Sequence, residues 1–190
     1  MSDLSISHIA LTDAIKQFEN YKKMAETAVS RINDDAFFRR SDSEANSIAI
    51  IMKHMAGNMR SRWRDFLTSD GEKQDRNRDT AFELDAESTR AQILALWENG
   101  WKMMFNTVRA LSPKDLSAMV VIRGDQHVVI EAIMRQLTHY AYHVGQIVLL
   151  SRNEVGTDWD SLSTPRGQSD AVNARLWGPD TPGNPAQKSQ

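Results

Sequence analysis

Residues 136–151 form the longest stretch of this chain without a charged side chain. A helix of that composition is buried over most of its surface, because it has no charged face to present to water. Its sides must therefore be covered by other helices of the same chain or by a second subunit. The stretch favours a packed helical architecture, and it makes a homodimer one way of covering the outer face.

A helical repeat of 3.6 residues predicts four long helices, because apolar side chains recur every three or four positions. The expected helices cover residues 11–32, 48–66, 88–111 and 128–152. Residues 41–44, Ser-Asp-Ser-Glu, match a capping box and predict the start of the second helix. Four long amphipathic helices predict an all-α bundle, a fold in which metal and cofactor sites form between facing helices.

The segments between and after these helices carry weaker signals. Residues 119–129 hold a β-branched run broken by Gly124-Asp125, which predicts a short hairpin or turn before the last long helix. The charged residues 69–87 indicate an exposed connection, with a lid over a site as the alternative. A short helix is expected around residues 169–176, and the Pro- and Gly-rich residues 178–190 are expected to be disordered.

Composition predicts a single domain over residues 1–177 and excludes several classes of function. The chain has 190 residues, of which 41% are hydrophobic, so it can bury a substantial core. The net charge of -2 argues against nucleic acid or an anionic membrane as a partner. The absence of cysteine excludes disulfides and Cys-type zinc sites. Without a signal-peptide pattern or a membrane-spanning run, we expect a cytoplasmic protein.

Three histidines are the strongest candidates for chemistry. His139 and His143 are one helical turn apart in the uncharged stretch, and His54 lies in the second apolar helix. Side chains four residues apart share one helix face, so both rings of the pair can reach a single point. Three neutral imidazoles from two helices would hold one divalent transition metal and leave positions for water or substrate. Core histidines that hydrogen-bond a carbonyl or carboxylate are the alternative.

Other histidine chemistries do not fit the spacing. No histidine follows a glutamate by three positions, as di-iron bundles require, and no His-Glu-x-x-His motif of zinc proteases occurs. His127 precedes His139 by about 18 Å along a continuous helix, and His8 is expected at the surface. A helical wheel places His139 and His143 opposite the most apolar stripe of the last helix, which comprises Ile130, Ile133, Leu137, Val144 and Val148.

Four further side chains could assist the histidines. Asn58 and Gln146 could orient a substrate or a histidine ring, although ordinary core hydrogen bonding explains them as well. Arg62 and Arg123 could bind a carboxylate or the anion of a thiol cofactor, although a salt bridge or a surface position is the simpler interpretation. The cluster of Arg60, Arg62 and Arg64 is most simply a solvated helix face.

Several joined motifs resemble the DinB/YfiT-like superfamily of metalloenzymes, and more narrowly a bacterial branch of it with no assigned function. They are Lys53-His-Met-Ala-Gly-Asn-Met-Arg-Ser-Arg-Trp-Arg-Asp-Phe66, His139-Tyr-Ala-Tyr-His-Val-Gly-Gln-Ile147, and residues 68–73, 121–124 and 161–167. The resemblance covers most of the chain. It implies a DinB-like four-helix bundle in up-down-down-up order, with a metal triad at His54, His139 and His143.

The resemblance also implies a reaction class. Relatives in the superfamily include transferases and isomerases that use bacillithiol or mycothiol, which implies a metal-dependent attack of a thiolate on a small-molecule electrophile. Because this chain has no cysteine, the thiol would be a low-molecular-weight cosubstrate. Zinc or nickel is the expected metal, and three neutral nitrogens also accept iron, manganese or cobalt.

A non-catalytic metal-binding stress or interaction protein is the alternative, since a fold does not imply an activity. Some members of the superfamily are known only as damage-inducible products. The two hypotheses differ in the geometry that they predict. An enzyme requires an open metal position beneath a pocket, whereas a structural site requires a fourth protein ligand.

Overall fold

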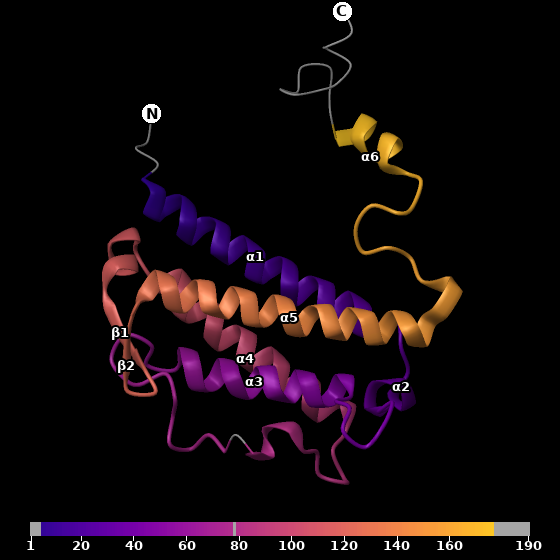
Figure 1. Cartoon of the computed structure of the whole chain (residues 1–190), viewed down its shortest axis with the longest axis horizontal. Coiled ribbons are helices and arrows are strands. Elements are labelled where there is room, and N and C mark those ends of the chain that lie inside the picture. Colours follow the sequence, from indigo (N-terminus) through magenta and orange to yellow (C-terminus); the bar gives the residue numbers. More distant parts are fainter. Residues whose placement is uncertain (1–4, 78, 177–190) are drawn as a thin grey trace, which may run out of the picture. The chain divides into compact units, whose positions relative to one another are not determined.

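Helices dominate the computed structural model, which describes residues 5–77 and 79–176 (Figure 1). The four predicted helices are present as α1 (Ile6–Val29), α3 (Ile48–Trp63), α4 (Arg90–Ala110) and α5 (Val129–Val155). The all-α class is therefore confirmed. The chain forms two compact units, of which the first extends to Val155 and the second begins at Gly156. A single domain over residues 1–177 stays a prediction, and the expected tail 178–190 lies outside the described residues.

The long helices pack in two pairs. α1 lies along α5, and both run from the hairpin end of the unit toward the opposite end (Figure 1). α3 and α4 pack side by side and run in the same direction. Two contacts show this direction: Gly100 lies against Ala56, and about two turns further along both helices the Thr107 hydroxyl donates to the Trp63 carbonyl at 2.9 Å. α3 and α5 run in opposite directions where they meet (Figure 1). The site described below lies at this contact.

The start of α3 differs from the predicted one. Its N-cap is Ser47, whose hydroxyl accepts the N–H of Ile50 at 3.2 Å. The capping box predicted at residues 41–44 is wrong. The Asp42 carboxylate there accepts two backbone N–H groups, at 2.9 and 2.8 Å, and so forms a local turn. Asp and Ser favour turns and caps for the same reason, since their side-chain oxygens bind nearby N–H groups.

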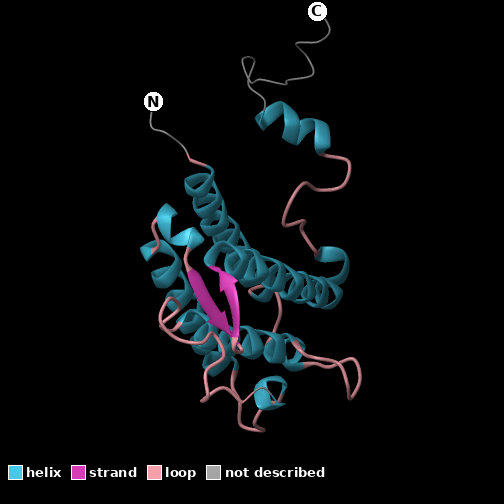
Figure 2. Cartoon of the chain, turned by 60° about the vertical axis from the view of Figure 1, so that its left-hand side comes forward, coloured by secondary structure: helices cyan, strands magenta, loops and turns pink. Residues whose placement is uncertain are grey.

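The expected hairpin is present as β1 (Met119–Ile122) and β2 (Asp125–Val128), which pair antiparallel (Figure 2). Its turn residues are Arg123 and Gly124, one position earlier than predicted, with φ of 59° and 81°. Positive φ at both positions is typical of a type I′ turn. The Asp70 carboxylate accepts both of their N–H groups at 2.8 Å. This carboxylate holds Arg123 in a conformation that non-glycine residues rarely adopt.

The remaining elements are short. α2 (Asp34–Phe38), η1 (Asp79–Phe82), η2 (Pro113–Ser117) and η3 (Gly156–Asp158) were not predicted, because segments of three to five residues carry no measurable periodicity. α6 (Ser169–Leu176) confirms the predicted short helix. No helix in the described part of the chain is long and apolar enough to cross a membrane. The cytoplasmic location stays a prediction.

An aromatic cluster ties the two helix pairs together. The Phe18 ring lies 6.2 Å from the Trp63 ring, 6.4 Å from the Trp101 ring and 5.6 Å from the Tyr140 ring. Trp63 Nε1 donates to the Tyr140 oxygen at 2.9 Å, and the Tyr140 hydroxyl donates to Asn58 Oδ1 at 3.2 Å. These buried polar atoms are thus paired, and the chain of hydrogen bonds fixes α3 against α5.

The buried face of α5 overlaps the predicted apolar stripe only in part. Ile133 and Val144 of the stripe are buried, whereas Ile130, Leu137 and Val148 are half-buried. His143 is buried together with Gln136 and Tyr140, so the buried face extends from the stripe toward the histidines. A hydrophobicity pattern counts Gln136 and Tyr140 as outward-facing, although the structure buries both of them beside the candidate site.

Another face of α5 is apolar and exposed. Met134, Tyr142 and Leu149 there have 56%, 63% and 56% of their surface exposed. Single exposed apolar side chains are ordinary in soluble domains. The homodimer expected from the sequence stays a prediction.

Close packing of α3 on α4 predicts opposite effects of alanine at two helical glycines. A Cβ at Gly100 would lie 3.2 Å from both the Ala56 Cα and the Met59 sulfur, whereas one at Gly145 meets nothing within 4 Å. We expect Gly100→Ala to lower the free energy of unfolding by about 1–3 kcal/mol through overpacking. Gly145→Ala should raise it by about 0.5–1 kcal/mol through lower chain entropy. Urea unfolding measures both, and equal stabilisation would contradict the close approach.

Candidate metal centre

Three histidine rings converge where α3 faces α5. His54 Nε2 lies 3.4 Å from His139 Nε2, which lies 3.0 Å from His143 Nε2. The ligand atoms all lie within 4.8 Å of one another, and this is the one group of three or more potential metal ligands among the described residues. His54 and His143 are buried, and His139 is half-buried. The predicted triad is therefore brought together.

The spacing of the nitrogens fits a transition-metal ion. With metal–nitrogen bonds of 2.0–2.1 Å, neighbouring ligands lie about 3.4 Å apart in a tetrahedral site and about 3.0 Å apart in an octahedral one. The two distances above lie in this range, and the third pair, His54 and His143, lies within 4.8 Å. A neutral imidazole has one N–H, so three Nε2 atoms that face one point cannot all pair with each other. A cation bound by their lone pairs removes that conflict, and zinc and nickel suit such a set.

Gln146 orients one of the rings. Its Oε1 accepts a hydrogen bond from His143 Nδ1 at 2.9 Å. The proton of His143 therefore lies on Nδ1, and the Nε2 lone pair faces the other histidines. The His54 ring stacks instead on Phe82 of η1, with centroids 4.2 Å apart and an interplanar angle of 21°. His54 Nδ1 is buried and has no hydrogen-bond partner among the described residues.

Burial keeps the histidines neutral. It lowers the pKa of His54 from 6.5 to about 3, and the neighbouring histidines and Arg76 add to this effect. It lowers the pKa of His139 to about 4, with further contributions from His143 and from nearby arginines. Burial also lowers the pKa of His143, although the hydrogen bond that His143 donates to Gln146 partly raises it. At neutral pH all three are thus in the form that binds metals.

A cavity of about 480 Å³ adjoins the histidines. Its wall includes His54 and His139, and a basic set of side chains from four parts of the chain: Arg62 from α3, Arg76 from the connection, Arg123 from the hairpin turn and Arg135 from α5. Two histidines of the triad thus face a space large enough for a small molecule, and four arginines give its wall a positive charge.

The structure places the four assisting residues differently from one another. Gln146 contacts His143, and Asn58 lines the cavity while its oxygen is held by Tyr140. Arg123 makes the expected salt bridge, with its Nε 3.2 Å from a Glu72 oxygen. Arg62 is only 2% exposed, so the prediction of a solvated position is wrong for this residue. Arg62 follows Asn58 by four positions and shares its inward face.

The connection over residues 69–87 is also more ordered around the site than the sequence indicates. Gly71 is buried, and two hydrogen bonds fix its position. Its carbonyl accepts a hydrogen bond from the Ser61 hydroxyl at 3.0 Å, and its N–H donates to the Val121 carbonyl at 2.8 Å. The prediction of an exposed connection is therefore wrong for this part. The segment brings Arg76 and Phe82 to the histidines, and no periodic pattern could have identified either residue.

Two other residues of the cavity could have been found from spacing. Arg135 precedes His139 by four positions, the same interval that singles out the histidine pair. Gln136 is 2% exposed and lines the cavity, and its Oε1 has no hydrogen-bond partner in the described part of the chain. His127 and His8 lie outside the cluster, since His127 pairs with Glu131 at 3.3 Å and His8 is exposed.

Comparison with known families places the chain. Residues 5–168 match the model of a family described as a protein of unknown function, DUF1572. The chain belongs to the DUF1572 family. The match includes the four long helices, the hairpin and all three histidines. No curated protein matches this DUF1572 chain, and the family description assigns no activity.

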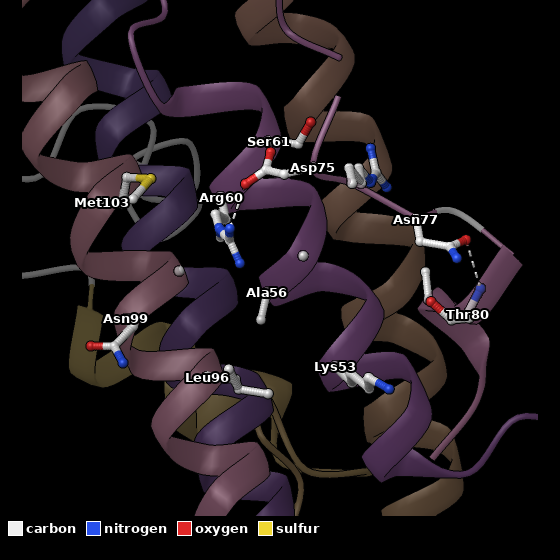
Figure 3. Close-up of a pocket in the computed structure, with 14 residues that line it drawn as sticks. Lys53, Ala56, Arg60, Ser61, Asp75, Asn77, Thr80, Leu96, Asn99 and Met103 are labelled. Atoms are coloured by element: carbon white, nitrogen blue, oxygen red, sulfur yellow. Dashed lines mark hydrogen bonds and ion pairs between the residues drawn. The ribbon is translucent and has the colours of Figure 1, made fainter. Parts of the chain in front are cut away.

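A second cavity of the DUF1572 chain, of about 440 Å³, lies on the other face of α3 (Figure 3). Lys53, Arg60, Leu96 and Met103 line it, and Arg76 contributes to both cavities. Arg60 binds Asp75 at 2.5 Å, and Lys53 Nζ donates to the Glu83 carbonyl at 2.6 Å. No group of three potential metal ligands lines it among the described residues. Lys53 and Arg60 are thus already paired, in contrast to Arg62 of the histidine cavity.

The lowered pKa values predict acid sensitivity of the metal-free DUF1572 protein. The unfolded chain takes up protons at His54 and His139 near pH 6.5, whereas the folded chain does so only near pH 3 and pH 4. The free energy of unfolding should therefore fall as the pH falls below 6.5, by about 1.4 kcal/mol per pH unit for each histidine. Urea unfolding with a chelator, at a series of pH values, measures this slope.

His54→Gln should make the dependence of the unfolding free energy on pH shallower. The variant lacks one of the histidines that take up a proton in the unfolded chain but not in the folded one. His8→Gln, at an exposed position, is the matched control. A slope in His54→Gln equal to that of the wild type would show that burial does not hold His54 neutral.

Proposed function

We propose that this protein is a metal-dependent enzyme in which His54, His139 and His143 hold one zinc or nickel ion. The observation that carries the proposal is the convergence of three neutral ring nitrogens beside a cavity of about 480 Å³. No fourth His, Asp or Glu joins the group among the described residues. Coordination positions are then left for water or substrate, as in catalytic rather than structural sites.

We also propose that the helices form a DinB-like four-helix bundle in up-down-down-up order. The helix directions support this arrangement, because α1 and α5 run one way and α3 and α4 run the other (Figure 1). Metal sites of bundles form from side chains on facing helices. The contact between α3 and α5 meets that requirement.

The reaction that fits best is the transfer of a thiol to an electrophilic small molecule in the cytoplasm. The thiol loses its proton, its sulfur bonds to an electrophilic carbon, and the leaving group departs with the bonding electrons. A divalent ion held by three neutral imidazoles lowers the pKa of a bound thiol or water, and so supplies a nucleophile near neutral pH. The chain has no cysteine, so the thiol is a cosubstrate.

The protein's own side chains prepare the site. Gln146 keeps the His143 proton on Nδ1, so that Nε2 presents its lone pair. The Phe82 ring covers one face of His54 and shields that ring from water. Asn58 and Gln136 line the wall, where their amide groups can bind polar atoms of a substrate.

Cobalt substitution tests the proposal. Protein loaded with Co²⁺ and titrated with mercaptoethanol should develop a sulfur-to-cobalt charge-transfer absorption in the near ultraviolet, which saturates at one thiol per chain. Ethylene glycol, which lacks the sulfur, should produce none. His143→Ala should lose both the cobalt and the absorption, because a ligand is missing.

The same preparation can be assayed for turnover, as loss of thiol in the presence of an electrophilic aryl chloride. Turnover should require the metal. Cobalt bound at one per chain with no change on addition of thiol would contradict the proposed reaction and indicate a non-catalytic metal site.

A further inference from the structure

Two buried arginines beside the histidines have guanidinium nitrogens that form no hydrogen bond with the described residues. Arg62 is 2% exposed, and the Arg76 side chain is 7% exposed. In each of them Nε and Nη1 are buried without a hydrogen-bond partner among the described residues. A buried charge destabilises a fold strongly unless it is paired and hydrogen-bonded. Such donors at a cavity wall therefore indicate a ligand that carries the complementary charge.

Nearby carboxylates do not balance the positive charge. Four arginines line the cavity, namely Arg62, Arg76, Arg123 and Arg135. Among the described residues, Glu72 pairs with two of these guanidinium groups, with oxygens 3.2 Å from Arg123 Nε and 3.5 Å from Arg76 Nη1. The Asp70 carboxylate also lies nearby, but it binds the backbone N–H of Arg123. Two carboxylates cannot neutralise four guanidinium groups, so an excess of positive charge remains at the wall.

The arginines on the other face of α3 are different. Arg60 binds the Asp75 carboxylate at 2.5 Å beside the second cavity (Figure 3). Arg64, which caps the end of α3, binds the same carboxylate at 2.6 Å. These two arginines are therefore paired, whereas Nε and Nη1 of the inward Arg62 form no hydrogen bond with the described residues. The deficit of acidic partners is specific to the histidine cavity.

The arginines lie at a defined interval from the histidines. His54, Asn58 and Arg62 repeat every four residues along α3, and Arg135 precedes His139 by four residues on α5. Along the helix axes, Arg62 is about 12 Å from His54 and Arg135 is about 6 Å from His139. A ligand that reaches both groups is an elongated small molecule, with its reactive atom at the histidines and its charge one to two helical turns away.

We infer that Arg62, Arg76, Arg123 and Arg135 bind a carboxylate or phosphate group of the substrate. The planar guanidinium matches both groups with two parallel N–H donors. The inference that the other end of this substrate reacts at the histidines rests on the proposed metal-dependent function. The anion site does not depend on that function, because the arginines alone form it.

The same charges couple the anion to the metal. Arg62, Arg76 and Arg135 line the same cavity as His54 and His139, so their positive charges disfavour a further positive charge there. They oppose a divalent cation at the triad for the same reason. A bound anion relieves that repulsion, so metal and anion should each strengthen the binding of the other by the same factor.

Nuclear magnetic resonance of the arginine Nε–H groups provides the test. Zinc-loaded and metal-free protein are titrated with succinate and with methyl phosphate, at ionic strength held constant with sodium chloride. At least one of the two anions should shift the Arg62 signal until the signal saturates. Bound zinc should lower the Kd of that anion by about tenfold. The anion with the lower Kd identifies carboxylate or phosphate as the group recognised.

Arg62→Met is the decisive variant, with Arg60→Met as the matched control two positions away. Arg62→Met should raise the Kd of the anion by at least about tenfold, because a charged hydrogen bond is lost. It should leave the urea midpoint unchanged or higher, since an unpaired buried charge is removed. A lower midpoint would assign Arg62 a structural role. Arg135→Gln, at an exposed position, repeats the binding test without altering the core.

The outcomes separate the two proposals. Anion binding that depends on Arg62, in a protein that binds no zinc, supports the arginine site and contradicts the metal-dependent function. Zinc bound at one per chain without saturable binding of either anion overturns the arginine site and leaves the metal centre standing. Equal weakening by Arg62→Met and Arg60→Met also overturns it, because the effect would then be general charge loss.

Discussion

Burial of three neutral imidazoles between α3 and α5 is the constraint on which the rest of this structure depends. A ring nitrogen removed from water needs a partner, and three of them facing one point cannot supply it to each other. The fold holds them there nonetheless. The hydrogen bonds from Trp63 through Tyr140 to Asn58 fix the two helices beside the site, and the aromatic cluster packs behind them. The packing of the two helices thus brings together three histidines that could hold a metal ion.

The parts of the chain outside the long helices determine what surrounds that centre. Asp70 binds the turn of the hairpin and so positions Arg123. The same connection, tied to α3 through Gly71, supplies Arg76 and the Phe82 ring that stacks on His54. The candidate metal ligands therefore come from regular helices, whereas two of the four arginines at the cavity come from a connection and a turn. Binding residues are often found on loops that a rigid scaffold positions.

Local sequence patterns predict the four long helices and the convergence of the three histidines. Long amphipathic segments repeat with the helical period, and the four-residue spacing places His139 and His143 on one face whatever the rest of the chain does. The hairpin follows from a β-branched run and a glycine. These signals are local, so they need no knowledge of tertiary contacts.

The errors have a common physical origin in tertiary contacts. A cluster of arginines such as Arg60, Arg62 and Arg64 predicts a solvated helix face. Arg62 is nevertheless buried, because it lies on the inward face of α3 with His54 and Asn58. The wheel for α5 correctly includes the buried Ile133 and Val144, but it omits the buried Gln136 and Tyr140 because both carry polar groups. Arg76 and Phe82 reach the site only through the path of residues 69–87, which depends on Ser61 and Val121 and leaves no periodic pattern.

Elemental analysis by mass spectrometry tests the metal centre most directly. The protein should be untagged and purified without chelator or added metal, alongside His143→Ala. We predict about one zinc or nickel ion per chain in the wild type, and almost none in the variant, with the helical circular dichroism spectrum unchanged. Wild-type protein that contains no metal and fails to bind added zinc, nickel or manganese would contradict the account. Full metal content in His143→Ala would contradict it equally, because the triad could not then be the site.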